Sequence, residues 1–392
     1  MPDLCAVERV GSLAEVDARR WDGVADPEDM YQSYAWLRAL ESTEDGATTY
    51  LIARQSGNGG ILGALPIYDS STTRGDYRYW PELHFQDLLH GAALLGDRLG
   101  LLAGSGAGFR TRLILDRALP GPTRLQVLWS LLHAACAVAD ERGLAYVFLL
   151  FLDSSARRDL ASAVGGNGHF RLAGTAQSEL ELPGAGVDDY LASLRKNVRT
   201  SARREMADFL GSCSAEVVPL REVATTIAPM IADVRAKHGM AHSVEAVTRR
   251  LAVHHEALGD DRSKAVVCRA DGRIVGAGVL CRWNDRLYVT DFGRHDGDVA
   301  DAFVYFNATI YEPVKYAYRT GLSRVATGAG SEIGKARRGA TLTPLTHLAM
   351  AAGGQADPPK VDASRADEPV AHWRTERSVH PRYFGPDWDD LL

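Results

Sequence analysis

AVVCRADGRIVGAGVLCRWN, residues 265–284, repeats the pattern of an earlier stretch, YLIARQSGNGGILGALPIY, residues 50–68. Each stretch has an apolar strand, a turn that contains glycine, and a second strand that opens with Ile-[Leu/Val]-Gly-Ala. Two apolar runs joined by such a turn are typical of a β-hairpin. A hairpin that recurs far along one chain indicates that a larger structural unit is present twice.

A second pair of segments supports the duplication. Residues 139–147 and residues 317–325 both read A-x-x-x-G-L-x-x-V, in which a helix pattern stops at glycine and an apolar strand follows. The order hairpin, helix, strand is therefore the same in both halves. We predict an α/β protein of two tandem units, each a mixed twisted sheet flanked by helices, with a cleft between them.

Length and composition agree with two domains. The chain has 392 residues, of which 46% are hydrophobic and 24% charged, and this suits two domains with ordinary cores. We expect a first unit over 1–185 with an insertion at about 69–110, a basic linking helix over 186–212, and a second unit over 213–392. The C-terminal segment is rich in Trp, Tyr and Phe, so we expect it to pack back on the fold.

Several classes of protein are not expected. No run of about 18 apolar residues occurs and the N-terminus lacks a signal-peptide pattern, which predicts a cytoplasmic protein without a membrane span. The five cysteines form no CxxC pair and read as reduced packing residues, so neither a disulfide framework nor a metal site is predicted. The net charge of −6 means that nucleic acid could bind only at a local basic patch.

One candidate site is the loop that follows the last matched strand. Gly328 and Gly330 are followed by the cations Lys335, Arg337 and Arg338. Ligands of open α/β sheets collect at the carboxyl ends of strands, where glycines expose backbone N–H groups to anions. The pattern predicts a clamp for a phosphate or an oxyanion. A solvated basic turn explains the same residues equally well.

A second candidate site is a predicted helix over residues 188–209. Its polar face carries five cations against two carboxylates, Glu205 and Asp208. The cations are Arg195, Lys196, Arg199, Arg203 and Arg204. Such an excess within three turns predicts contact with the phosphates of a nucleic acid. The alternative is an ordinary surface helix that pairs with acids elsewhere.

Polar and aromatic residues near the strands of the second unit are candidates for proton transfer. Asp291 interrupts an apolar strand just before a glycine, and His295 follows it. A carboxylate or an imidazole can take a proton from an attacking amine, and a tyrosine hydroxyl can donate one to a leaving group. Asp291, His295 and Tyr305 are therefore predicted to be catalytic, together with Lys335, which is expected to stabilise the developing oxyanion. Tyr305 and Tyr311 fit core packing as well.

These segments, in this order, resemble the Fem-like predicted N-acyltransferases of the GNAT superfamily. The resemblance covers most of the chain. It rests on Ser33-Tyr34-x-Trp36-Leu37, Gly63–Tyr68, Tyr190-Leu191-x-x-Leu194 through Glu205, the hairpin at 265–284, Tyr305-Phe306-x-x-x-Ile310-Tyr311, Ala317-x-x-x-Gly321-Leu322-x-Arg324, Gly328-x-Gly330 and Lys335-x-x-Arg338-Gly339.

The resemblance implies two GNAT-like acyltransferase units and an active site in the second unit. It implies transfer of an acyl group, from a thioester or from the ester of an aminoacyl-tRNA, to an amine without a metal. Lys335 and Arg338 match the cationic loop that lies beside the donor phosphate or the reacting carbonyl in the family. Arg337, Gly328 and Gly330 belong to the same predicted donor-binding loop.

One departure from the superfamily pattern bears on the donor. Acetyl-CoA enzymes of the superfamily place Gln/Arg-x-x-Gly-x-Gly/Ala between a strand and a helix, where backbone amides hold the pyrophosphate. The corresponding stretch here, residues 293–298, is GRHDGD, with two carboxylates where the anion would lie. Residues 117–123 of the first half also lack the pattern. Coenzyme A is therefore disfavoured as the donor.

We therefore predict an N-acyltransferase that forms an amide bond. The predicted co-substrate is aminoacyl-tRNA, no cofactor is expected to be bound, and the acceptor is an amine of a small or peptide-like molecule. The setting is cell-wall or secondary-metabolite biosynthesis, the latter including antibiotics. Two alternatives stay open: a GNAT acyltransferase that uses acyl-CoA, and a non-catalytic protein that binds RNA on the same fold.

Overall fold

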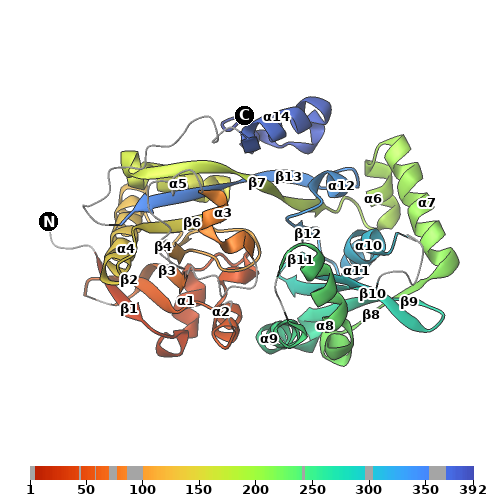
Figure 1. The fold of residues 1–392 in the computed structure, drawn as a ribbon, viewed down its shortest axis with the longest axis horizontal. Helices are drawn as coiled ribbons and strands as arrows, with labels where there is room; N and C mark the ends of the chain where they lie inside the picture. Colours follow the sequence, from red (N-terminus) through yellow and green to blue (C-terminus); the bar gives the residue numbers. More distant parts are fainter. Residues whose placement is uncertain are drawn as a thin grey trace. The chain divides into compact units, whose positions relative to one another are not determined.

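The computed structural model describes residues 5–43, 46–57, 59–69, 77–85, 100–240, 243–295, 303–352 and 368–392. Part of the insertion expected at 69–110 therefore lies outside the described residues. The chain forms two compact units (Figure 1). The first comprises Met1–Thr175, Pro344–Pro381 and Pro386–Leu392, and the second Ala176–Thr343 and Arg382–Gly385.

The first unit contains these elements: β1 (Cys5–Val10), η1 (Leu13–Glu15), α1 (Ala18–Val24), η2 (Met30–Gln32), α2 (Tyr34–Leu40), β2 (Thr49–Gln55), β3 (Ile61–Asp69), η3 (Tyr77–Tyr79), α3 (Pro81–His84), β4 (Gly100–Ala103), β5 (Ile114–Leu115), α4 (Gly121–Glu141), β6 (Tyr146–Leu152), α5 (Ser154–Val164), η4 (Gly165–Asn167), α14 (Glu368–Val379) and η7 (Pro386–Trp388). Strand β7 (Gly168–Glu181), strand β13 (Thr341–Ala351) and the short turn η6 (Pro381–Tyr383) each cross from one unit into the other.

The second unit contains these elements: α6 (Val187–Ser193), α7 (Lys196–Ser212), β8 (Ser214–Pro219), α8 (Leu220–Lys237), α9 (Val244–Arg262), β9 (Ser263–Ala270), β10 (Arg273–Trp283), β11 (Arg286–Arg294), α10 (Val304–Phe306), η5 (Asn307–Tyr311), α11 (Glu312–Arg319), β12 (Arg324–Gly328) and α12 (Glu332–Ala336). The element η5 is a π-helix. It precedes Pro313, which has no N–H with which to continue an α-helical ladder to Thr309.

The two units have the same strand order. The first has β1-β2-β3-β4-β6-β13 and the second β8-β9-β10-β11-β12-β7. In each, the first four strands are antiparallel, the fourth and fifth are parallel, and the last is antiparallel to the fifth. This confirms the predicted fold class of two tandem α/β units with mixed sheets.

The matched hairpins share an irregularity. In β2–β3, Ala53 pairs with Gly63 and Arg54 with Ile61, so the register skips Leu62. In β9–β10, Cys268 pairs with Gly276 and Arg269 with Ile274, so the register skips Val275. The skipped residues occupy the same position of the Ile-[Leu/Val]-Gly-Ala pattern. A bulge at one position of two hairpins is the structural counterpart of the sequence repeat.

The glycine of that pattern is needed for packing in both units. A Cβ on Gly63 would lie 2.6 Å from the Leu115 side chain, and a Cβ on Gly276 would lie 2.4 Å from the Val304 side chain. Both distances are shorter than real Cβ contacts. The glycine therefore lets the segment that follows the fourth strand of each unit, β4 or β11, approach the second hairpin strand closely.

Apolar side chains cover both faces of each sheet. In the first unit, α1 and α2 contribute Trp21 and Leu37 to one core, and α4 and α5 contribute Leu131 and Leu160 to the other. In the second unit, α6, α7 and α11 pack on one face, and α8 and α9 on the opposite face. The buried run of β6, YVFLLFL, is the pattern expected of a strand covered on both faces.

Three features of the chain differ from the sequence prediction. The helix expected over 188–209 is two helices, because Leu194 and Arg195 adopt extended backbone angles between α6 and α7. Strand β13 was not predicted. The first unit ends at Thr175 instead of residue 185, because the second half of β7 pairs with β12, and the second half of β13 pairs with β6 in the first unit.

The C-terminal segment, which the sequence analysis assigned to the second unit, lies mostly on the first. Trp373 and Trp388 are fully buried with ring centroids 5.0 Å apart, and Trp373 Nε1 donates to the Ala173 carbonyl at 2.9 Å. Among the described residues, no helix combines the length and the apolar character that a membrane crossing requires.

Candidate functional site

The loop after β12 has an unusual backbone. Gly328, Gly330 and Ser331 all adopt positive φ angles, of 68°, 84° and 53°. Glycine adopts such angles readily, whereas a serine in the left-handed region carries strain. The loop then enters the short helix α12. Its conformation is therefore set by contacts with its surroundings.

Lys335 supplies the main contact. Its ammonium is buried and donates to the carbonyls of Thr327 at 2.6 Å, Gly328 at 3.3 Å and Ala329 at 3.2 Å. Three acceptors match the three protons of an ammonium. The prediction that Lys335 faces a donor phosphate or an oxyanion is corrected: the side chain is turned into the loop and holds the glycine-rich backbone.

Glu332 holds the loop from the other side. Its Oε1 accepts from the Gly330 N–H at 2.8 Å and from the Ala176 N–H at 3.3 Å, which joins the loop to β7. The Lys335 N–H also donates to the Ser331 carbonyl at 3.0 Å. The loop is thus fixed at successive residues by one cation and one carboxylate.

Arg338 forms a buried ion pair. Its guanidinium donates to the Glu205 carboxylate from Nε at 2.9 Å and from Nη2 at 2.6 Å, and from Nη1 to the Gly334 carbonyl at 2.8 Å. Tyr311 donates its hydroxyl to the same carboxylate. The expected role of Arg338 in donor binding is corrected, because its guanidinium is already engaged by a residue on α7.

Aromatic residues complete this network. The Arg338 guanidinium lies over the ring of Phe306, and the Tyr190 hydroxyl donates to the Arg338 carbonyl at 2.7 Å. Burial, together with the hydrogen bond to Glu205, raises the pKa of Tyr311. The network joins α6, α7, η5 and the loop after β12 into one packed structure.

Tyr305 directly precedes Phe306, the residue whose ring lies under the Arg338 guanidinium. Its ring packs edge-on against Phe292 and Phe306, each with centroids 5.0 Å away. Burial raises the pKa of its phenol. The hydroxyl is therefore protonated at neutral pH and can serve as a proton donor.

His295 and Arg337 are both exposed. His295 follows the end of β11, and its N–H donates to the Val275 carbonyl at 3.2 Å. Arg337 follows α12 in the loop that carries Lys335. Both side chains are accessible to a ligand.

Asp291 does not lie at the edge of a cleft, and this prediction is corrected. The side chain is buried on β11, with Arg235 Nη2 at 2.5 Å from Oδ1 and Arg250 Nε at 4.0 Å from Oδ2. Burial alone would raise its pKa, but the two arginines outweigh burial and hold the pKa at about 2. Such a carboxylate is a weak base at neutral pH, so we assign Asp291 a structural role.

Helix α7 presents cations to solvent. Arg195, Lys196, Arg203 and Arg204 are exposed, and Arg199 is half-buried with its guanidinium donating to the Ala192 carbonyl at 3.1 Å. Arg204 pairs with Asp208 at 3.4 Å, both side chains being largely exposed. In the described part of the chain, Arg195, Lys196 and Arg203 form no ion pair.

The charges of these cations add to the positive electrostatic potential at the N-terminus of the helix. Arg195 and Lys196 stand at the N-terminus of α7, whose first turn contains no carboxylate. The N-terminus of a helix carries a partial positive charge, so cations there are unfavourable unless an anion is bound nearby. Helix α6 has the usual arrangement, with Asp188 and Asp189 in its first turn.

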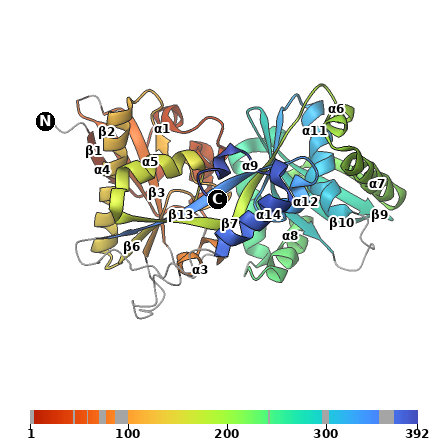
Figure 2. The same ribbon diagram turned by 90° about the horizontal axis from the view of Figure 1, so that it is seen from above.

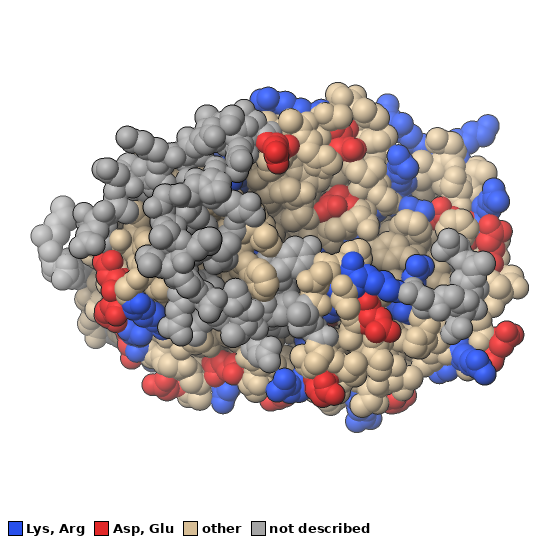
Figure 3. Space-filling view, in the orientation of Figure 1, with Lys and Arg blue, Asp and Glu red and all other residues tan. Residues whose placement is uncertain are grey.

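Figures 1 and 2 show α6 and α7 next to each other at one side of the second unit. In Figure 3, Lys and Arg side chains are frequent on the part of the surface where these helices lie. The structure therefore places the basic residues of the second candidate site on an exposed surface.

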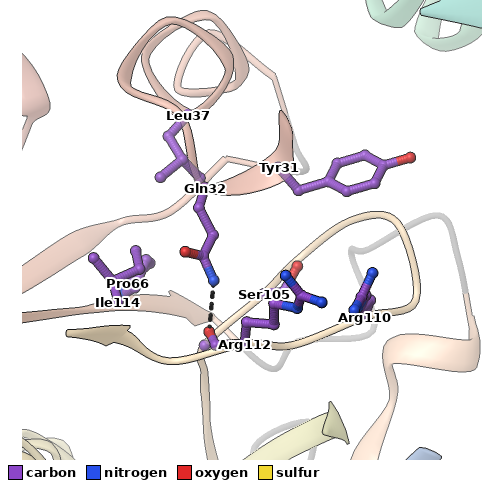
Figure 4. Close-up of a pocket in the computed structure, with 9 residues that line it drawn as sticks. Tyr31, Gln32, Leu37, Pro66, Ser105, Arg110, Arg112 and Ile114 are labelled. Atoms are coloured by element: carbon purple, nitrogen blue, oxygen red, sulfur yellow. Dashed lines mark hydrogen bonds between the residues drawn. The ribbon is translucent and has the colours of Figure 1, made fainter. Parts of the chain in front are cut away.

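The first unit contains a small pocket of a different character (Figure 4). Its lining includes Gln32, Ser105, Arg110 and Arg112, and Gln32 Nε2 donates to the Arg112 carbonyl at 2.9 Å. Both arginines pair with Asp153, Arg112 at 2.8 Å and Arg110 at 3.4 Å. The cations of this pocket are therefore neutralised by carboxylates of the same unit.

Further carboxylates belong to this network. Asp26 pairs with both Arg112 and Arg117. Burial raises the pKa of Asp29, against the attraction of the nearby Arg110 and Arg112. Neither carboxylate was singled out from the sequence.

Sequence reasoning missed the partners of the predicted residues. Glu205 was counted only as a carboxylate opposing the basic face, and Ser331 and Glu332 were not singled out. One signal was available: Ser331 and Glu332 directly follow Gly330 where a strand pattern gives way to a helix. Nothing in the local sequence marks Arg235 as the partner of Asp291.

Comparisons with known proteins agree with this fold. Residues 111–353 match the FemAB-like family, described as peptidoglycan biosynthesis/recognition. No curated protein sequence matches the chain.

Solved structures share the architecture at low identity. FemX is 11% identical with a TM-score of 0.55, covering 87% of this chain and 96% of its own. A tandem GNAT protein from the clavulanic acid biosynthesis pathway is 12% identical with a TM-score of 0.51, covering 90% and 100%. A conserved protein of unknown function from Bacteroides thetaiotaomicron is 13% identical with a TM-score of 0.53, covering 88% and 100%.

At these identities the likeness to solved structures supports the fold, while the family model covers more than half of the chain. The two tandem units predicted from the repeat, and the GNAT-like fold that the resemblance implies for them, are therefore confirmed. The chain belongs to the FemAB-like family of acyltransferase-fold proteins.

Proposed function

We propose that this protein is an aminoacyltransferase that forms an amide bond. It transfers the aminoacyl group of an aminoacyl-tRNA to an amine of a small or peptide-like acceptor. Membership in the FemAB-like family and the likeness to FemX support a transferase of this kind. The family description, peptidoglycan biosynthesis/recognition, favours a cell-wall acceptor, and a secondary-metabolite acceptor is the variant of the proposal.

The observation that carries the choice of donor is the set of exposed cations on α7. Arg195, Lys196 and Arg203 have no carboxylate partner among the described residues, and they stand on the N-terminal part of a 17-residue helix. Positive charge held on a surface in this way attracts the phosphates of RNA. An aminoacyl-tRNA has many phosphates close to its reactive ester, whereas a simple thioester donor has few.

The reaction needs positioning more than strong catalysis. The acceptor nitrogen attacks the ester carbonyl, a C–N bond forms, and the bond to the ribose oxygen breaks. An activated ester reacts readily with an amine once the two are held in place, and donors that stabilise the developing oxyanion supply most of the remaining acceleration. The loop at 328–331, fixed by Lys335 and Glu332, is a rigid element suited to that task.

Two side chains are assigned proton transfers. Tyr305 donates its hydroxyl proton to the leaving ribose oxygen, since the phenol is protonated at neutral pH. His295 takes a proton from the acceptor amine, since its imidazole is exposed and an imidazole can act as a base. Asp291 is left out of the mechanism, because its pKa of about 2 makes it too weak a base.

An acyl-CoA-dependent reaction is the second candidate. The likeness to the tandem GNAT protein from the clavulanic acid pathway favours it. The segment that would hold a pyrophosphate, residues 293–298, extends beyond the described residues. Its two carboxylates, Asp296 and Asp298, oppose a bound pyrophosphate electrostatically.

The deciding experiment offers the purified protein a panel of cell-wall precursor amines together with either radiolabelled aminoacyl-tRNA or radiolabelled acetyl-CoA. We expect an amide product whose mass equals acceptor plus aminoacyl residue, and whose formation stops when the tRNA is digested beforehand with RNase. Product from acetyl-CoA but not from charged tRNA would replace the proposal with the acyl-CoA reaction. Salt-sensitive retention of RNA without turnover of either donor would indicate a binding protein.

A further inference from the structure

The second unit carries another group of cations, on elements other than α7. It lies at one end of strands β9 and β10 and on the neighbouring helices α9 and α11. Its members are Arg262, Lys264, Arg282 and Arg319, and we call it the strand-end patch. Within the described ranges of the chain, none of the four forms an ion pair.

The strand register places Lys264 and Arg282 on one face of the sheet. Lys264 pairs with Leu280, which precedes Arg282 by two residues on the adjacent strand. Val266 and Leu280 belong to the core that α11 covers. Side chains two residues apart in a strand lie on the same face, so Lys264 and Arg282 both lie on the α11 side of the sheet.

The two exposed arginines of the patch lie against aromatic rings. The Arg262 guanidinium is 5.4 Å from the ring centroid of Trp283, and its Nε donates to the Leu258 carbonyl at 3.0 Å. On α11, the Arg319 guanidinium is 5.9 Å from the ring centroid of Tyr316, which packs against the same core. Contact with a ring restricts a guanidinium, so less conformational freedom is lost when an anion binds.

The acidic residues near the patch are mostly engaged by other cations. Three carboxylates close to it in the sequence pair with cations outside it: Asp260 with Arg221 at 2.9 Å, Asp285 with Arg324 at 3.4 Å and Glu312 with Lys315 at 2.6 Å. Among the described residues, Asp261 beside Arg262 forms no ion pair. The patch therefore sets four cations against one carboxylate, on a chain whose net charge is −6.

The patch lies at the opposite end of the sheet from the loop after β12. Strand β12 begins at Arg324, which pairs with Arg286, and Arg286 in turn pairs with Trp283, next to Arg282. The loop begins after Gly328, at the other end of β12. The four residue steps between these ends span about 13 Å. A ligand of the patch is therefore held away from the bond that reacts in the proposed mechanism.

We propose that the strand-end patch is a second contact surface for RNA, which binds phosphates of the donor tRNA at a distance from its aminoacylated end. This inference rests on the proposed function, in which the donor is an aminoacyl-tRNA. Planar guanidinium groups match phosphate oxygens, and aromatic rings beside them can stack on unpaired bases. An acidic protein would engage the charges and would leave the rings without a role.

The binding test neutralises two cations of the patch in the full chain, Arg282→Gln together with Arg319→Gln. Filter binding of bulk tRNA at low salt should show about 10-fold lower affinity, and the dependence of log affinity on log salt should weaken by about 2, because two phosphate contacts are lost. The matched control is Arg269→Gln with Arg273→Gln, at the other end of β9 and β10, and it should keep the affinity within about 2-fold. Equal losses in both double variants would overturn the patch.

Two further measurements secure this result. A urea unfolding midpoint close to that of the wild type shows that the variant is folded; if Arg282→Gln disturbs the fold, Lys264→Gln with Arg319→Gln takes its place with the same expected loss of affinity. Polyglutamate tests the other class of partner. A loss of polyglutamate binding as large as the loss of tRNA binding would overturn the assignment to RNA and indicate an acidic protein.

Kinetics distinguish this inference from the proposed function. Because the patch lies away from the reacting bond, Arg282→Gln with Arg319→Gln should raise KM for aminoacyl-tRNA about 10-fold and keep kcat within about 2-fold. A fall in kcat at unchanged KM would contradict the inference. Amide product formed with an unchanged KM in the variant would refute the patch alone. Weaker tRNA binding by the variant, without amide product from the wild type, would refute the proposed function and retain the RNA surface.

Discussion

Arginines of the two units are used in opposite ways. In the first unit, Arg110 and Arg112 share Asp153, and Arg112 also pairs with Asp26. In the second unit, Arg195 and Arg203 of α7 stand in solvent without such partners in the described part of the chain. Paired cations stabilise a unit, and because their charge is neutralised they produce little electrostatic potential outside it. Cations without partners contribute little to stability and are available to an anionic ligand.

In the second unit, α7 contacts a paired cation on its inner face and carries unpaired cations on its outer face. Glu205 is buried on the inner face of the helix and neutralises Arg338, whereas the outer face carries the exposed cations. The inner pair fixes the helix on its unit, and the outer charges define the proposed RNA surface. The function of a charged residue is thus decided by the face on which it lies. Four predictions test this division, in order of decreasing effect.

The largest effect is expected from breaking the inner pair. Glu205→Gln leaves the buried Arg338 guanidinium without its carboxylate and weakens the Tyr311 contact. Loss of one partner of a buried ion pair typically lowers the free energy of unfolding by about 3–5 kcal/mol. Urea denaturation measures the loss. Asp208→Asn on the outer face of the same helix is the control and should change the free energy of unfolding by about 0.5 kcal/mol or less.

The next effect concerns the outer face. The double charge reversal Lys196→Glu, Arg203→Glu should weaken binding of aminoacyl-tRNA about 100-fold at low salt and leave the unfolding midpoint close to that of the wild type, because both side chains are exposed. Filter binding and KM for the donor measure the affinity. The same reversal at Arg19 and Arg20, exposed on α1 of the first unit, is the matched control. Equal weakening by both pairs would show that only net charge matters and would remove α7 from the proposal.

A smaller effect is expected in the arginine network of the first unit. Asp153→Asn keeps an acceptor for the Ala156 N–H, at 2.9 Å in the native chain, but removes the charge that Arg110 and Arg112 share. We expect a loss of about 2 kcal/mol in the free energy of unfolding, since the two arginines are partly solvated. RNA affinity should stay unchanged. A large fall in RNA affinity without a loss of stability would contradict the division between the units.

The last prediction is a pH dependence. The pKa of Asp291 in the folded protein, about 2, lies below its ordinary value of 3.8. A depressed pKa stabilises the fold above about pH 4, and this contribution, roughly 2 kcal/mol, is lost as the pH falls toward 2. The difference in unfolding free energy between the wild type and Asp291→Asn should therefore shrink between pH 5 and pH 2. If the difference in unfolding free energy did not change with pH, the charge of Asp291 beside Arg235 would contribute nothing to stability.

Much of the fold could be read from periodicity and turn residues. The hairpins at 50–68 and 265–284 were predicted close to β2–β3 and β9–β10, because alternating apolar residues and Gly-containing turns are local signals. Strand β13 was not predicted, because its residues pair with β6, which is far away in the chain, and because Pro344 interrupts the strand pattern of the sequence. The break at Leu194–Arg195 was missed because helical spacing continues across it.

The geometry of the candidate site could not be predicted from the sequence. The sequence analysis proposed Lys335 and Arg338 for a loop beside the donor and Tyr305 for proton transfer, and in the structure Lys335 and Arg338 are both bound to residues of the protein itself. The sequence could not show that Lys335 turns toward three carbonyls or that Arg338 meets Glu205. A count of cations contains no information about partners that lie far along the chain.

The amino-acid sequence alone determined the duplicated α/β unit, the span of most strands and helices, and the excess of positive charge on α7. These properties depend on residues that are neighbours in the chain, where periodicity and turn chemistry act. Only the tertiary structure decided which charges are neutralised and which strand closes each sheet. Those outcomes depend on contacts between residues that are far apart in the chain. The strength of such contacts depends on burial, and burial arises only when the chain folds.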